Sequence, residues 1–302
     1  MKNKFLICIV GPTAIGKTTL SIKVANAFDT EIISCDSRQF FKEMNIGTAV
    51  PDVEEQAAAK HHFIHSHSIK EDYSVGKFET EAINTIDQLF KTHDVLVMVG
   101  GSGLYVDAVT KGLDHFPKVD PEIRKKLNAI YESEGIASLQ KQLKELDPKS
   151  YNTIEVQNPH RIIRALEICI GTGKPFSSFK SNPNKKRNFT PIYIGLNAER
   201  EIIYNRINQR VDIMIDKGLL EEVEQLLPYK NLNALQTVGY RELFDYFEGN
   251  CSLEIAVEEI KKNTRRFAKR QLTWFKKNEQ TIWFDYLTEP KTIIDSIKKV
   301  IS

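Results

Sequence analysis

This sequence lacks long apolar segments, paired cysteines and a strong excess of charge of either sign. Its longest apolar runs have about six residues, whereas a membrane-spanning helix needs roughly 20. The four cysteines, Cys8, Cys35, Cys169 and Cys251, are isolated, so neither a disulfide framework nor a usual zinc-ligand spacing is present. We therefore expect reduced thiols in a cytoplasmic protein that does not enter a membrane.

The net charge is only +2, although 27% of the residues are charged. This balance neither requires nor excludes a nucleic-acid partner, because what matters is where the basic residues lie. Met1–Lys4 leads directly into the first apolar run, so we expect no signal peptide. A chain of 302 residues can form one large domain or two modest ones.

The most specific motif is G-P-T-A-I-G-K-T at residues 11–18. It follows the apolar run Phe5–Val10 and opens a helix-like stretch to Phe28, which is the setting of a phosphate-binding loop. The N–H groups of such a loop point at an anion, Lys17 supplies charge for terminal phosphates, and the Thr18 hydroxyl can ligate Mg²⁺. The predicted phosphate-binding residues are Gly11, Pro12, Thr13, Ala14, Ile15, Gly16, Lys17 and Thr18.

The first 112 residues alternate between strand and helix patterns. Predicted strands cover Phe5–Val10, Glu31–Ser34 and Val95–Val99, and Ser74 is the predicted N-cap of a helix to about Phe90. Val95–Val99 is almost purely apolar, as expected when helices cover both faces of a parallel sheet. The predicted fold class is therefore α/β, with a P-loop NTPase-like parallel sheet flanked by helices.

Residues 113–190 differ in character, because no strand candidate occurs between Leu113 and Phe189. Asp120-Pro121 and Asn158-Pro159 each predict an N-cap followed by a first-turn proline of a helix. Strand character returns at Ile192–Leu196, and Thr281–Phe284 is the predicted last strand. We therefore predict a catalytic core of 1–112 and 191–302 that is interrupted by an all-helical insertion domain at 113–190.

A second candidate site residue is Asp36, which follows the predicted strand Glu31–Ser34. In motor and switch NTPases a further apolar strand ends in an aspartate that helps to hold Mg²⁺, but Val95–Val99 ends in glycines. Ligands of open α/β sheets lie at the carboxyl ends of strands, so Asp36 is expected to face the phosphate loop. A loop aspartate is as often only a local cap.

Basic residues recur at spacings of three and four over Lys261–Lys277, which we predict to be one long helix. No acidic residue lies between Glu259 and Glu279, which favours nucleic acid over an ion-paired, solvated face. Arg206 and Arg210 lie one turn apart and suit either a phosphate clamp or a surface ion-pair face. The residues predicted to share the basic face are Arg265, Arg266, Lys269, Arg270, Thr273, Lys276 and Lys277.

Six blocks, taken in order, resemble the tRNA dimethylallyltransferases, and the resemblance covers essentially the whole chain. They are the loop at 11–18, D-S-R-Q-F-F at 36–41 with M-N-I-G-T-A at 44–49, G-G-S-G-L-Y at 100–105, N-P-H-R-I-I-R-A-L-E at 158–167, V-G-Y-R-E at 238–242 and A-K-R-Q-L-T-W-F at 268–275. Ser102 stands where the family usually has threonine, and His160 where glutamine is common. We expect no zinc-finger extension of the eukaryotic type, so the resemblance implies a bacterial member.

The resemblance implies a prenyltransferase that moves a dimethylallyl group from dimethylallyl pyrophosphate to N6 of the tRNA adenosine at position 37, next to the anticodon. It implies that the loop holds this pyrophosphate rather than ATP, with Mg²⁺ as the cofactor on Thr18. The absence of an Mg²⁺-binding aspartate after Val95–Val99 agrees with a ligand other than ATP. The insertion would grip the anticodon stem-loop, and we expect the protein to act as a cytoplasmic monomer.

The resemblance also implies roles for individual residues. Asp36 would accept the proton of the amine, Ser102 would position the amine, and Arg210 would stabilise the departing pyrophosphate. Gln39 would read the edge of the base, which must be flipped out of its stack to react. The residues expected to contact tRNA are Asp36, Ser37, Arg38, Gln39, Ser102, Arg124, His160, Arg161, Arg164, Arg241, Lys269 and Arg270.

Three other functions share parts of this pattern. A prenyltransferase of free adenine nucleotides shares the loop and Asp36 but has less need for the insertion and the basic helix. A small-molecule P-loop kinase would transfer phosphate instead of a prenyl group. A tRNA-binding module with a relic loop would not need Lys17, Thr18 and Asp36 intact.

Overall fold

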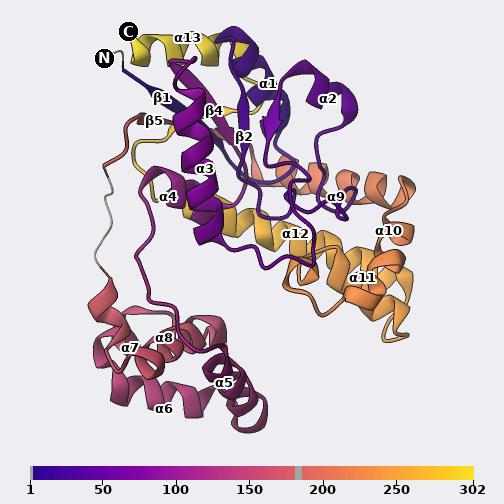
Figure 1. Cartoon of the computed structure of the whole chain (residues 1–302). Coiled ribbons are helices and arrows are strands. Elements are labelled where there is room, and N and C mark those ends of the chain that lie inside the picture. Colours follow the sequence, from indigo (N-terminus) through magenta and orange to yellow (C-terminus); the bar gives the residue numbers. More distant parts are fainter. Residues whose placement is uncertain (1–2, 181–185) are drawn as a thin grey trace. The chain divides into compact units, whose positions relative to one another are not determined.

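The computed structural model describes residues 3–180 and 186–302 of the chain (Figure 1). The chain divides into two compact units. The core unit combines Met1–Thr110 with Arg187–Ser302, and the insertion unit is Lys111–Lys186. The sequence predicts these divisions within a few residues, at 113 and 190, and residues 181–185 of the predicted insertion lie outside the described part.

The core unit is built on a six-stranded sheet in the order β3-β2-β4-β1-β5-β6, in which every neighbouring pair is parallel. The carboxyl ends of all strands therefore meet at one edge, where ligands of such sheets bind. The predicted parallel α/β fold is confirmed. The strands are β1 (Phe5–Val10), β2 (Ile32–Ser34), β3 (His61–His62), β4 (Val95–Val99), β5 (Thr190–Asn197) and β6 (Ile282–Asp285).

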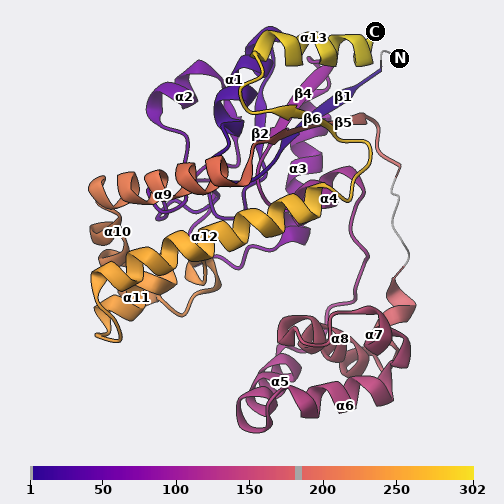
Figure 2. The same cartoon turned by 180° about the vertical axis from the view of Figure 1, so that it is seen from behind.

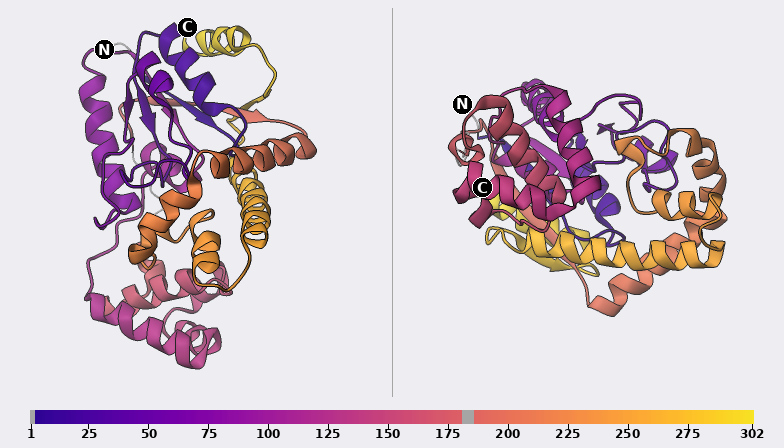
Figure 3. Two further views of the ribbon diagram at one scale, coloured as in Figure 1. Left: turned by 90° about the vertical axis from the view of Figure 1, so that its right-hand side faces the viewer. Right: turned by 90° about the horizontal axis from the view of Figure 1, so that it is seen from below.

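Two apolar layers cover the sheet. Because successive side chains of a strand point to opposite faces, the continuous apolar runs of β1 and β4 serve both layers. On one face, Leu6 and Met98 pack with α3 (Val75–Leu89) and α4 (Gly103–Thr110). On the other face, Ile7 and Val97 pack with α1 (Lys17–Ala27) and α13 (Pro290–Ile301), so α3 and α1 lie on opposite sides of the sheet (Figure 3).

One long helix, α12 (Leu253–Phe275), reaches from α4 to α11 (Figure 2). It starts before the predicted Lys261, because the Ser252 hydroxyl caps it by accepting from Ile255 N. It ends at Phe275, just short of the predicted Lys277. The other helices of the core unit are α2 (Val53–Ala58), α9 (Arg200–Asp216), α10 (Leu219–Leu226), α11 (Tyr240–Phe247) and the 3-10 turns Leu227–Tyr229 and Asn233–Leu235.

The described residues of the insertion unit form helices joined by loops and contain no strand, as predicted from the sequence. Asp120 accepts from Glu122 N and Asn158 accepts from Arg161 N, so both predicted N-caps are confirmed. Leu127, Leu139 and Leu166 form part of its own apolar core. The helices are α5 (Pro121–Glu134), α6 (Ile136–Leu146), α7 (Pro148–Thr153), α8 (Pro159–Thr172) and the 3-10 turn Phe176–Phe179.

The strand β3 is absent from the sequence-based expectation, because His61–His62 is too short and too polar to give a strand pattern. Its place at the sheet edge comes from pairing with β2 alone. Within the described residues, no helix combines the length and the apolar character that crossing a membrane requires.

Candidate active site

The phosphate-loop motif forms a tight turn between β1 and α1 at the carboxyl edge of the sheet. Gly11 has φ +145°, and a Cβ there would lie 2.5 Å from the Leu196 carbonyl oxygen of β5, so the position requires glycine. Lys17 Nζ donates to the Pro12 carbonyl at 2.7 Å, which folds the ammonium beneath the loop. Loop residues 13–18 line a cavity of about 750 Å³, which we call the loop cavity.

A buried side chain of α12 fixes the loop. Gln271 Oε1 accepts from Thr13 N at 2.9 Å, and its Nε2 donates to the Gly101 carbonyl at 2.9 Å. Gln271 is 5% exposed, and a Cβ on Gly101 would collide with its amide. Gln271 thus joins the loops after β1 and β4. Sequence reasoning missed this role, although Gln271 lies within one of the resembling blocks.

The two arginines of α9 bind the loop. Arg206 Nε donates to the Ala14 carbonyl at 2.7 Å, and an Arg210 terminal nitrogen donates to Thr13 Oγ1 at 3.4 Å. Both side chains line the loop cavity, so the phosphate-clamp alternative describes them better than a surface ion-pair face. Burial, and then the nearby charge of Arg206, lower the pKa of Arg210 from its usual range.

Burial changes the pKa of Lys17 more than that of Arg210. Removal from water, reinforced by the charge of Arg210, lowers the pKa of its ammonium to about 8, while Asp36 acts in the opposite direction. A cation held in this way gains most from a bound polyanion, because the anion restores the favourable environment that burial removed.

Asp36 lies where the sequence predicts it, just beyond β2 and within the loop cavity. Its Oδ1 accepts from Arg38 N at 3.1 Å. Asp36 is therefore a local cap and also lines the same cavity as the phosphate loop. Ser102 Oγ accepts from Ser37 N at 3.1 Å and donates to Ser37 Oγ at 3.1 Å. Ser102 therefore positions the segment beside Asp36 in this structure.

A second, smaller cavity of about 220 Å³ adjoins the first, and we call it the apolar cavity. Thr13, Asp36 and Arg210 line both cavities. The lining of the apolar cavity also contains the polar side chains of Ser37, Arg38, Thr48, Thr237 and Thr264, and the rest of the wall is largely apolar. The apolar wall includes Ile207, Val211, Met214, Leu219, Val238, Ile260 and Phe267.

A carboxylate that the sequence analysis missed holds the wall formed by residues 45–49. Glu222 of α10 accepts from the N–H groups of Asn45, Ile46 and Gly47 at 3.1, 2.7 and 3.0 Å. The Tyr240 hydroxyl donates to the same carboxylate at 2.7 Å. A Cβ on Gly47 would lie 2.6 Å from the Tyr240 ring, which explains why the blocks at 44–49 and 238–242 occur together.

Gln39 and Arg38 differ in how freely they can reach a ligand. Gln39 Nε2 donates to the carbonyls of Thr48 and Ala49 at 3.2 and 2.9 Å, so its amide is used within the loop and is not free to read a base in this structure. Arg38 lines the apolar cavity and donates to the Asn233 carbonyl at 3.0 Å. Arg241 is exposed at the start of α11.

Two histidines at the loop cavity were not predicted either. His61 and His65 line it, and Nε2 of each is buried without a hydrogen-bond partner among the described residues. A buried polar atom without a partner is costly, so these nitrogens suit contact with a ligand. The sequence gives no local pattern that singles out either histidine.

Two flanks of α12 border different cavities. Lys269 and Lys276 line a third cavity beside β5 and β6. On the opposite flank Phe267 lines the apolar cavity, and the Arg270 guanidinium lies 5.7 Å from the Phe267 ring centroid. The helical period correctly predicts a wide basic arc, but Lys269 and Arg270 meet different surroundings.

The three arginines of the insertion unit that we predict to contact tRNA each form an ion pair with a glutamate of the same unit. Arg124 and Arg164 both contact the largely buried Glu167, at 3.2 and 3.1 Å. Arg161 pairs with Glu155 at 3.2 Å, and His160 is exposed. Each of these arginines keeps a partly exposed side chain, so the ion pairs orient the guanidinium groups at the surface.

Comparisons with known sequences agree with one another. The family model described as IPP transferase matches residues 39–278. A tRNA dimethylallyltransferase of Flavobacterium johnsoniae is 61% identical over 300 residues and covers 97% of each chain. One of Christiangramia forsetii is 62% identical over 300 residues and covers 99% of each chain.

Solved structures give the same result. A full-length tRNA isopentenylpyrophosphate transferase from Bacillus halodurans is similar with a TM-score of 0.73 and 38% identity, covering 99% of this chain and 96% of that one. A eukaryotic dimethylallyltransferase acting on tRNA is similar with a TM-score of 0.79 and 26% identity, covering 99% of this chain and 78% of that one. The similarity therefore extends over both units.

Proposed function

This chain belongs to the IPP transferase family, and from that premise we propose that it is a prenyltransferase acting on tRNA. It transfers a dimethylallyl group from dimethylallyl pyrophosphate to N6 of the tRNA adenosine at position 37, next to the anticodon, and releases pyrophosphate. One observation carries the proposal. The loop cavity suits a pyrophosphate, the adjoining apolar cavity suits a five-carbon chain, and Asp36 and Arg210 line both.

The reaction is a displacement at the allylic carbon. The N6 lone pair forms the new carbon–nitrogen bond while the carbon–oxygen bond to pyrophosphate breaks, and the bonding electrons leave with the pyrophosphate. Asp36 accepts the proton that N6 loses. Lys17, Arg210 and the N–H groups of the loop stabilise the charge on the leaving group, and the cavity walls align the reactants.

Mg²⁺ fits the donors at the loop. Thr18 and Asp36 both line the loop cavity and offer the hard oxygen atoms that this ion prefers. Mg²⁺ keeps several waters and binds substrate phosphates, so it needs few protein ligands. Thr18 would hold it, and the ion would supply further neutralisation of phosphate charge.

The insertion unit and the basic arc of α12 supply the proposed tRNA contacts. The exposed His160 and Arg161, together with Arg124 and Arg164, would meet the anticodon stem-loop. We propose that the protein acts as a cytoplasmic monomer. Light scattering of the protein with and without tRNA gives the stoichiometry.

Mass spectrometry of the reaction product tests the function. Unmodified tRNA, the protein, Mg²⁺ and dimethylallyl pyrophosphate are incubated together, and the digested nucleosides are weighed. A gain of one five-carbon unit on adenosine supports the proposal. Modification of free AMP instead of tRNA favours the nucleotide prenyltransferase, phosphate transfer from ATP favours the kinase, and tRNA binding without any product favours the binding module.

The lowered pKa of Lys17 predicts the pH dependence of donor use. Below pH 8 the group is an ammonium that attracts the pyrophosphate, and above pH 8 the free enzyme loses this charge. We expect kcat/KM for the donor to fall by about tenfold per pH unit above this value, because kcat/KM reports ionisations of the free enzyme. In a Lys17→Arg variant the guanidinium stays charged, so the fall should move to higher pH. A fall at the same pH in both proteins contradicts the assignment.

Salt dependence tests the basic arc. If Lys269 and Arg270 meet phosphates, replacing either by alanine lowers the salt slope of tRNA binding by about 0.7–0.9, and replacing both weakens binding at low salt. Donor binding should change little. Filter binding across a salt series measures the slope, with Lys299→Ala on α13 as the control. An unchanged slope in the double variant would mean that this arc is only a solvated surface.

A further inference from the structure

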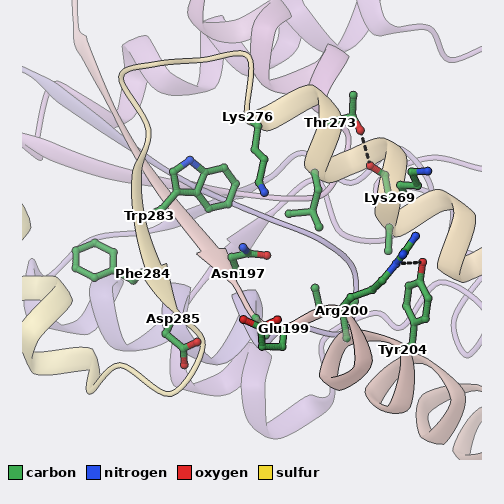
Figure 4. A pocket seen from close by; sticks show the side chains of 14 residues that line it. Asn197, Glu199, Arg200, Tyr204, Lys269, Thr273, Lys276, Trp283, Phe284 and Asp285 are labelled. Carbon is green, nitrogen blue, oxygen red and sulfur yellow. Dashed lines mark hydrogen bonds between the residues drawn. The ribbon is translucent and has the colours of Figure 1, made fainter.

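The third cavity, of about 600 Å³, opens beside the carboxyl ends of β5 and β6 (Figure 4). It lies within the core unit, and none of its lining residues lines the loop cavity or the apolar cavity. Its walls come from β5, β6, the start of α9 and one flank of α12. The proposed prenyl transfer makes no use of it. Its volume lies in the range of small-molecule sites, about 300–1,000 Å³.

Three cationic side chains, from the start of α9 and from the C-terminal part and end of α12, converge on this cavity. Arg200 opens α9, and its Nε donates to the Tyr204 hydroxyl at 3.1 Å (Figure 4). Lys269 lies in α12 and Lys276 directly follows its last residue, and neither ammonium has a hydrogen bond or ion pair within residues 3–180 and 186–302. The first turn of α9 also lacks a side-chain cap. Glu199 and Asp285 are the two carboxylates of the lining, so positive charge prevails.

An aromatic surface accompanies these charges. Trp283 of β6 pairs in register with Gly195 of β5, and a Cβ at Gly195 would lie 2.5 Å from the indole. The indole therefore lies flat against the backbone of β5, and one face of the ring is turned to the cavity (Figure 4). Figure 4 also shows the Lys276 side chain extending toward Trp283. A flat aromatic ring beside cations is the arrangement that binds a base together with its phosphate.

We propose that this cavity binds a nucleotide, with the base stacked on Trp283 and the phosphate held by Lys269, Lys276 and Arg200. The carboxylates of Glu199 and Asp285 are acceptors for ribose hydroxyls or an exocyclic amine. The nucleotide comes either from the free pool or from a part of the bound RNA outside the reacting loop. The inference goes beyond the proposed transfer and does not depend on it.

Fluorescence of Trp283 tests the proposal without any turnover. The chain has two tryptophans, so a Trp274→Phe variant leaves Trp283 as the single reporter. Stacking of AMP should quench it saturably, and the quenching should persist when Lys17→Ala is added, because the phosphate loop is a separate site. Lys276→Ala should weaken AMP binding by about tenfold, since a hydrogen bond to a charged group is lost.

Lys277→Ala is the matched control, because Lys277 is the exposed neighbour of Lys276 and does not line the cavity. It should leave AMP affinity unchanged. Addition of unmodified tRNA identifies the source: release of AMP assigns the site to an RNA nucleotide, and simultaneous binding assigns it to the free pool. Absence of saturable quenching at millimolar AMP overturns the proposal, as does equal weakening in both lysine variants. If Trp274→Phe does not fold, calorimetry on the wild-type chain and the two lysine variants makes the same comparison.

Discussion

Asp36→Asn should leave tRNA bound and almost abolish turnover. The amide keeps the size of the side chain and can still accept from Arg38 N, so the loop should keep its shape. It cannot take the proton of the amine, and loss of a positioned base typically lowers a rate by about 10²–10⁴-fold. Single-turnover kinetics with saturating donor measures the step directly. The assay should be run near pH 7, because the charge of Asp36 raises the pKa of Lys17 and its removal would make Lys17 lose its proton at lower pH.

Asp52→Asn provides the matched control for this result. Asp52 also lines the loop cavity, but it does not line the apolar cavity, and its side chain caps α2 by accepting from Glu55 N at 2.8 Å. Asparagine caps a helix about as well as aspartate, so turnover should stay within a small factor of the wild type. Near-normal turnover in Asp36→Asn, or an equal loss in Asp52→Asn, would remove Asp36 from the role of base.

The positions of the loop and Asp36 could be predicted because each depends on local sequence. Phe5–Val10 and the glycines that follow specify a buried strand and a tight turn, and Asp36 follows the second strand. In a parallel sheet both must lie at the same edge. The same rule brings the glycines after β4 to this edge, where Gly101 meets Gln271.

Gln271 and Glu222 could not be predicted in this way. Each lies in an ordinary helical sequence, and each acts on a segment more than a hundred residues away along the chain. Their bonds to the backbone of the phosphate loop and of residues 45–47 depend on how α12 and α10 pack against the sheet. Helical periodicity assigns a residue to a face but does not specify what that face meets. The different surroundings of Lys269, which lines the third cavity, and Arg270, which lies beside Phe267, escaped prediction for the same reason.

Lys17→Ala should abolish donor use while tRNA affinity stays close to that of the wild type. The ammonium is held at the phosphate loop by its hydrogen bond to the Pro12 carbonyl, and the neighbouring Arg206 is bound to the Ala14 carbonyl instead. Removing one preorganised group that stabilises developing charge typically costs about 10²–10³-fold in rate. We therefore expect kcat/KM for dimethylallyl pyrophosphate to fall by at least this factor.

Lys217→Ala separates this effect from a general loss of positive charge. Lys217 lines the same cavity, but it is exposed, and its ammonium has no hydrogen bond or ion pair to the phosphate loop in the part of the chain that the structure describes. Screening by solvent should limit its effect on kcat/KM to a small factor. Donor titrations and tRNA filter binding are measured on the same preparations, with thermal unfolding as the check on folding. If tRNA affinity fell in Lys17→Ala while donor kinetics did not change, the phosphate loop would bind the nucleic acid and not the pyrophosphate.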